Sequence, residues 1–94
     1  MNKEYYRKCI ADKRKEIVGL RADIVNLKEQ KSKKMTSLAN SIKNTSSKLN
    51  KEAYRKQKIS EGERFTREIE RKKAKIEDVK KQIESYKKSL ANAK

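Results

Sequence analysis

The chain has no histidine, no proline and no tryptophan, and it has one cysteine among its 94 residues. Without histidine, the commonest general base and metal ligand is missing. A single cysteine excludes an intramolecular disulfide and a cysteine metal cluster. The only glycines, Gly19 and Gly62, are too far apart to form a loop that cradles phosphate. We therefore expect no catalytic residue, no metal site and no cofactor, and we predict that the chain is not an enzyme.

Apolar residues are also scarce, at 33% of the chain against 44% charged residues. Low hydrophobicity with high net charge is typical of disordered chains. Here, however, the apolar residues are regularly spaced, and a proline-free composition of this kind is typical of a long helix or coiled coil. We therefore predict an all-α fold with a narrow apolar seam in place of a globular core.

Long hydrophobic runs are absent as well. No segment approaches the roughly 20 apolar residues that cross a bilayer, and the first residues do not resemble a signal peptide. We expect no membrane span and a cytoplasmic location.

Positive charge is abundant: 28 basic against 13 acidic residues give a net charge of +15. Residues 1–47 carry 12 basic and 5 acidic residues, and residues 48–94 carry 16 and 8, so the charge is spread along the chain. Such a surface attracts anionic partners such as nucleic acid. The alternative is a solvated, lysine-rich coiled-coil surface with no anionic ligand.

Apolar residues recur in both halves at alternating three- and four-residue spacing, which keeps them on one face of a helix. Lysines interrupt the pattern at several positions. They are compatible with a helix–helix seam, because their methylenes can lie on apolar surface while the ammonium reaches water. We predict a helix–helix assembly seam made of Tyr6, Ile10, Ile17, Leu20, Ile24, Leu27, Leu38, Phe65, Ile69, Ile76, Val79, Ile83, Tyr86 and Leu90.

The centre of the chain, Asn44-Thr45-Ser46-Ser47, is its most polar and least helix-favouring stretch. Eleven-residue steps, from Leu27 to Leu38 and from Tyr54 to Phe65, mirror each other about this centre. We predict one module over residues 1–94, with a helix over about 4–43, a turn over about 44–47 and a helix over about 48–91. The alternative is one continuous helix paired with another chain.

A long two-helix hairpin buries only a narrow stripe and is marginal by itself. We therefore expect a self-associating hairpin, a homo-oligomer, or arms that pack on an effector domain or partner protein. Residues just off the seam widen the apolar face. They are Cys9, Val18, Val25, Met35 and Ile59.

Two runs of basic residues are candidates for anion binding along phosphates. Acidic residues follow both runs closely and aromatic residues for base stacking are few, so we expect only weak, salt-sensitive binding of nucleic acid. The candidate anion-binding residues are Lys13, Arg14, Lys15, Arg71, Lys72 and Lys73.

The order of these features resembles the N-terminal coiled-coil region of bacterial TIR-domain immunity proteins. The matching elements are Tyr5-Tyr6, the heptad arm from Ile10 to Leu27, the polar stretch 41–47, and Glu63-Arg64, Glu70-Arg71-Lys72-Lys73 and Lys80-Lys81-Gln82-Ile83. The resemblance implies a region that oligomerises or senses ahead of a TIR domain that cleaves NAD. No residue here corresponds to the TIR domain or its catalytic glutamate, so only the assembly role carries over.

Three functions follow from these patterns. The first is a non-catalytic oligomerisation or scaffolding coiled coil, and the resemblance implies that it would cluster a TIR effector in bacterial antiphage defence. The second is a basic helical protein that binds nucleic acid or an anionic surface. The third is a small helical partner or chaperone of a larger protein.

Overall fold

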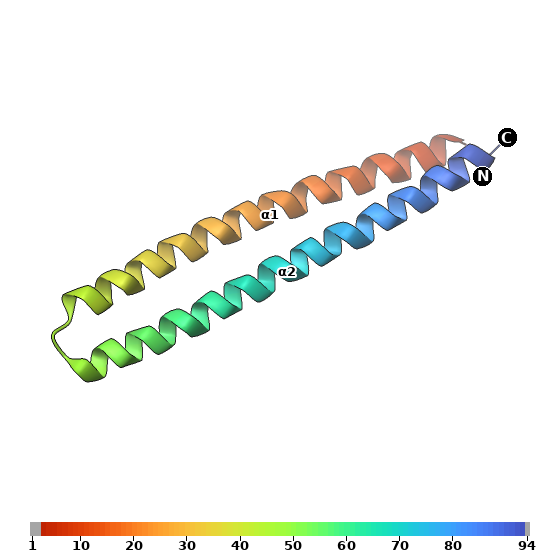
Figure 1. The fold of residues 1–94 in the computed structure, drawn as a ribbon. Coiled ribbons are helices and arrows are strands. Elements are labelled where there is room, and N and C mark those ends of the chain that lie inside the picture. Colours follow the sequence, from red (N-terminus) through yellow and green to blue (C-terminus); the bar gives the residue numbers. More distant parts are fainter. Residues whose placement is uncertain (1–2, 94) are drawn as a thin grey trace. The chain divides into compact units, whose positions relative to one another are not determined.

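The computed structural model describes residues 3–93 and is all-α (Figure 1). Helix α1 spans Lys3–Asn44 and helix α2 spans Lys48–Asn92. The two long helices pack against each other as an antiparallel hairpin, as the sequence predicts. The alternative of one continuous helix is wrong, because residues 45–47 leave the helical conformation.

The turn between the helices is built by hydroxyl side chains. Ser47 Oγ accepts a hydrogen bond from the backbone N–H of Asn50 at 3.3 Å, which is the N-cap arrangement for α2. Thr45 Oγ1 accepts one from the backbone N–H of Ser47 at 3.4 Å. The N–H of Thr45 donates to the carbonyl of Ser41 at 3.2 Å and closes the last turn of α1. No residue in the described chain has a positive φ, so this turn requires no glycine.

The hairpin divides into two units, each containing a stretch of both helices. The terminal unit comprises residues up to Asp23 and from Arg71 onwards, and the turn unit comprises Ile24–Glu70. Among the described residues, the buried apolar side chains of the terminal unit are Ile10, Ile17, Ile76, Val79 and Ile83. Those of the turn unit are Ile24, Leu38, Phe65 and Ile69.

The other five residues of the expected seam are less enclosed. They are Tyr6, Leu20, Leu27, Tyr86 and Leu90, and all five are half-buried. Every residue expected in the seam is therefore turned at least partly away from solvent, and full burial is confined to the isoleucines, Leu38, Phe65 and Val79.

The two eleven-residue steps show the same burial pattern in the structure. Half-buried residues lie four, seven and eight positions after Leu27 in α1 and after Tyr54 in α2, and a buried residue follows at the eleventh position of each step. In α1 these residues are Lys31, Lys34, Met35 and buried Leu38, and in α2 they are Lys58, Glu61, Gly62 and buried Phe65. The irregular spacing seen in both halves of the sequence is therefore accompanied by the same change of inward face in both helices.

Gly62 lies in the seam of the turn unit, and Gly19 lies on the exposed surface of the terminal unit. A Cβ added at Gly62 would lie 3.8 Å from Met35 Sδ, which is ordinary van der Waals contact. A Cβ added at Gly19 would meet nothing within 4 Å. Neither glycine is therefore required for a close approach of the helices.

We predict that Gly62→Ala stabilises the hairpin. Alanine is better than glycine inside a helix by up to about 1 kcal/mol, and the new methyl group also contacts Met35. A stabilisation of that size corresponds to a rise of roughly 4–8 °C in Tm for a chain of this length. Circular dichroism at 222 nm measures it. Gly19→Ala is the matched control, since it reports the effect of helix propensity alone. A lower Tm for Gly62→Ala than for the wild type would mean that the helices approach too closely at residue 62 to accommodate a methyl group.

Candidate protein-interaction surface

The seam of the hairpin carries lysines as well as apolar residues. Lys13, Lys31, Lys34, Lys58 and Lys72 are all half-buried, and no charged side chain of the described residues is buried. In the turn unit the Nζ of Lys31 donates to Thr66 Oγ1 at 3.1 Å. In the terminal unit the Nζ of Lys72 lies 3.5 Å from Asp23 Oδ2. The lysines thus reach polar partners or water at the edge of the seam, and they leave fewer apolar contacts between the helices.

The six candidate anion-binding residues do not form one surface. Consecutive residues of an α-helix point about 100° apart. Lys13 and Lys72 therefore turn into the seam, where Lys13 pairs with Glu16 at 3.5 Å and Lys72 pairs with Asp23. The other four residues are exposed on different sides of their helices. They are Arg14, Lys15, Arg71 and Lys73.

A groove of about 520 Å³ lies between α1 and α2 within the terminal unit. Its apolar lining combines the buried side chains of Ile17 and Ile83 with Val18, which is 65% exposed. The remaining lining residues are charged, and all of them are exposed. They are Arg14 and Arg21 from α1, and Lys80, Glu84 and Lys87 from α2. The groove therefore has an apolar floor between two basic walls.

The two walls of this groove differ in how their charges are compensated. On α2, Lys80 Nζ lies 3.3 Å from Glu77 Oε1, and Lys87 Nζ lies 3.3 Å from Glu84 Oε1. On α1, neither Arg14 nor Arg21 makes an ion pair with any residue that the structure describes. The α1 wall consequently carries two uncompensated guanidinium groups, one on each side of Val18 along the helix.

A second groove, of about 620 Å³, lies within the turn unit. Ile59 is 64% exposed there and stands beside half-buried Met35 and Gly62. Basic residues line this groove as well, together with Glu63 and Thr66. They are Lys31, Lys58 and Arg67. Each unit thus presents an apolar patch bordered by cations.

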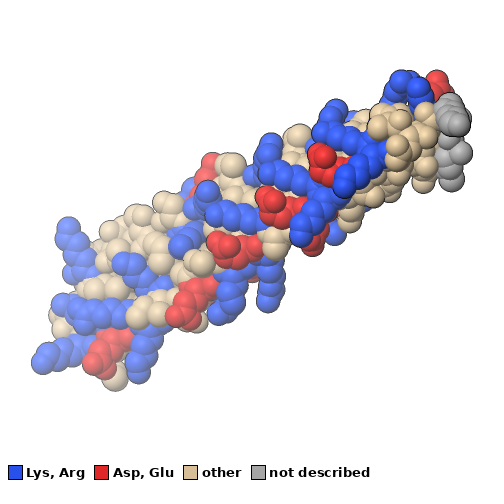
Figure 2. All heavy atoms as spheres, turned by 45° about the vertical axis from the view of Figure 1, so that its right-hand side comes forward, with Lys and Arg blue, Asp and Glu red and all other residues tan. Residues whose placement is uncertain are grey.

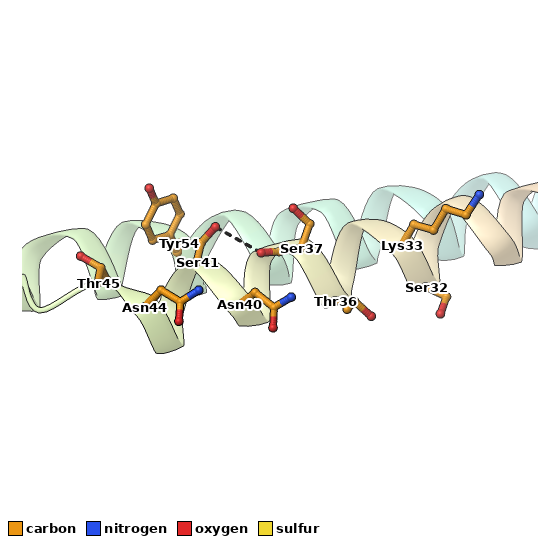
Figure 3. A pocket seen from close by; sticks show the side chains of 9 residues that line it. All are labelled: Ser32, Lys33, Thr36, Ser37, Asn40, Ser41, Asn44, Thr45 and Tyr54. Atoms are coloured by element: carbon orange, nitrogen blue, oxygen red, sulfur yellow. Dashed lines mark hydrogen bonds between the residues drawn. The ribbon is translucent and has the colours of Figure 1, made fainter.

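A third hollow, near the turn, has a different character (Figure 3). It has a volume of about 820 Å³, and its lining is mostly hydroxyl and amide side chains of α1, with Tyr54 from α2. Ser41 Oγ donates to the backbone carbonyl of Ser37 at 3.1 Å, a local bond that uses the hydroxyl within its own helix. Lys33 is the one charged residue among those that line it. This hollow lacks both an apolar floor and a converging set of charges.

Elsewhere the surface mixes both signs of charge. On the face drawn in Figure 2, carboxylates are interspersed among the lysines and arginines. Arg64 shows the local pattern: it pairs with Glu61 at 2.9 Å and with Glu68 at 3.1 Å, and it stacks 4.4 Å from the centre of the Phe65 ring. The hydrogen bond to Glu61 is the main cause that raises the pKa of Arg64.

Aromatic side chains gather in the terminal unit near residue 5. The rings of Tyr5 and Tyr6 meet edge to face with centroids 5.4 Å apart. A hydrogen bond with the Cys9 side chain, together with the nearby ionisable groups of Cys9 and Tyr86, raises the pKa of Tyr5 above its ordinary value.

Sequence reasoning found Val18 and Ile59 as flanking apolar residues, but it missed the basic walls of the groove around Val18. The signal was present, because Arg14 and Arg21 are one heptad apart and share a face with Val18. It also missed Leu49, which is 77% exposed at the start of α2.

Comparisons with known proteins add no assignment. No family model, no curated protein and no solved structure matches this chain. Within residues 3–93, no helix is long and apolar enough to cross a membrane, and no group of three or more potential side-chain ligands could hold a metal ion.

We predict that Lys34→Leu stabilises the hairpin, because Lys34 occupies a half-buried seam position in α1. Replacing its ammonium by a branched apolar end would add burial worth roughly 1–2 kcal/mol. Urea unfolding followed by circular dichroism measures the change in the unfolding free energy. Lys33→Leu is the matched control, since its neighbour Lys33 is exposed and should change that free energy little. Equal effects of the two substitutions would show that position 34 does not face α2.

Proposed function

We propose that the chain is a non-catalytic assembly module, a helical hairpin that holds protein elements together by packing a further helix on its flank. The observation that carries this proposal is the exposure of large apolar side chains in grooves between the helices. Val18 is 65% exposed in the terminal unit and Ile59 is 64% exposed in the turn unit. In each groove the exposed side chain adjoins residues of the seam, so a docked helix would extend the existing core.

The composition of the seam supports the same function. Isolated long helices depend on tertiary packing for most of their stability. Lysine occupies several seam positions in both helices, so the two helices alone bury little apolar surface against each other. A third helix in a groove would cover Val18 or Ile59, which the two helices leave in solvent. Binding and stability of the hairpin would therefore be linked.

The most specific form of this function is clustering of an effector domain. The resemblance to the coiled-coil region ahead of bacterial TIR domains supports it, and the process would then be antiphage defence. In that form, copies of the hairpin assemble and bring their effector domains close together. The basic walls of the grooves oppose direct contact between two copies through these surfaces, so we favour assembly through a partner of opposite charge.

Binding to nucleic acid or another anionic surface is the second candidate. Its support is the net charge of +15 and the exposed cations on both helices. The interspersed carboxylates and the apolar groove floors favour a protein partner instead, because a phosphate backbone offers nothing to cover an isoleucine or a valine.

Site-specific photo-crosslinking tests the assembly function. A photoreactive amino acid is placed at Val18 or Ile59 in the chain as expressed in its own cells. We expect discrete protein adducts at both positions, several-fold more abundant than at the exposed control positions Lys15 and Lys56. Equal labelling at all four positions would contradict the proposal, and adducts with nucleic acid at all four would establish the second candidate.

A further inference from the structure

We propose that the groove of the terminal unit binds an acidic amphipathic helix of another protein. This inference rests on the proposed assembly function, and it adds the chemistry and geometry of the partner. It depends on three features of the groove: an apolar floor, a basic wall on α1 that lacks ion pairs, and a wall on α2 whose lysines are already paired.

The floor suits the apolar stripe of a helix. Ile17 and Ile83 are 8% and 6% exposed and are already part of the seam, whereas Val18 is largely open to solvent. All three side chains line the same groove. A helix laid along the groove would place residues at three- and four-residue spacing onto this floor, which is the usual way in which an amphipathic helix occupies a groove. The partner therefore carries an apolar stripe of that spacing.

The α1 wall adds a distance requirement. Arg14 and Arg21 are seven residues apart on one continuous helix, which corresponds to about 10.5 Å along its axis. Guanidinium groups without a partner bind carboxylates through paired, charge-assisted hydrogen bonds. Two Asp or Glu residues seven apart on the partner helix would match this spacing, with the apolar contact to Val18 between them.

The α2 wall makes the groove asymmetric. Lys80 and Lys87 are each 3.3 Å from a glutamate of their own helix, so they have less need of carboxylates from a partner. The acidic flank of the partner helix should therefore face α1, and its flank toward α2 can be neutral. This asymmetry fixes which side of the partner lies against which helix.

A second copy of this chain fits the groove poorly. Arg14, Arg21, Lys80 and Lys87 line it against the single acid Glu84. Two such grooves face to face would bring together four guanidinium groups without ion pairs among the described residues, two from each copy, and like charges repel over roughly 8 Å at physiological salt. A basic flank on the incoming helix would meet the same repulsion, because Arg14 and Arg21 are unpaired.

Fluorescence anisotropy of a labelled acidic helical peptide tests the proposal. The peptide has about 21 residues, enough for roughly 30 Å of helix, with leucines at seam spacing and glutamates seven residues apart on one flank. We expect Arg14→Gln/Arg21→Gln to weaken its binding by about tenfold or more, because two charge-assisted contacts are lost. The matched control Lys8→Gln/Lys15→Gln removes the same charge from exposed residues of α1 outside the groove and should weaken binding less than about twofold.

Two further comparisons separate the contribution of the apolar floor to peptide binding from that of the basic walls. Val18→Ser should weaken peptide binding, whereas Ile59→Ser, which removes a similarly exposed apolar side chain from the turn unit, should not. A peptide with glutamine in place of glutamate should bind more weakly than the acidic peptide. Circular dichroism of each variant confirms that its helix content equals that of the wild type.

Several results would overturn the inference. Equal losses of peptide affinity in the two double variants would mean that only the overall charge of the hairpin matters. Equal affinity for the glutamine peptide and the acidic peptide would show that the arginines do not bind carboxylates of the partner. Displacement of the peptide by a DNA duplex, with the same dependence on Arg14 and Arg21, would assign the groove to nucleic acid. If the acidic peptide fails to bind while position 18 still crosslinks to a protein, this inference fails and the assembly function stands; loss of the crosslinks as well would remove both.

Discussion

The structure depends on packing between two helices along a seam in which buried isoleucines alternate with residues that are only partly buried. Ile10, Ile17 and Ile24 on α1, with Ile69, Ile76 and Ile83 on α2, provide most of the buried side chains that the structure describes. Half-buried lysines occupy the same seam and cannot bury their ammonium groups without a large desolvation cost. The same sequence pattern thus forms the hairpin and limits how much stability the two helices gain from each other.

The flanking surfaces follow from this limit. Since the seam is narrow, residues beside it remain in solvent, and each unit has at least one large aliphatic side chain among them. The charges around them are unevenly compensated: glutamates of α2 pair with lysines of the same helix, while Arg14 and Arg21 on α1 stay unpaired. Apolar surface beside unpaired cations favours a partner that combines apolar residues with acidic ones. Binding of that partner would also stabilise the hairpin, because it covers apolar surface that the two helices leave exposed.

Much of the fold could be predicted from the sequence, because heptad spacing and the polar stretch before Ser47 are both local signals. The position of the turn follows from the side-chain chemistry of this stretch, and the structure shows that Ser47 caps α2. Lys13 and Lys72 interrupt the heptad pattern in the sequence, and in the structure both are half-buried at the seam. The basic groove was missed because it joins residues from two helices, and its lining depends on how they are paired across the seam.

Thermal unfolding of the isolated chain shows whether this hairpin is marginally stable until a further helix covers it. The measurement follows helix content at 222 nm at low micromolar concentration and physiological salt. We expect a broad transition at low temperature, since lysines interrupt the seam throughout the hairpin. A sharp, cooperative transition above about 70 °C, beyond the usual range for mesophilic domains and unchanged on dilution, would show that the two helices are stable without a further helix.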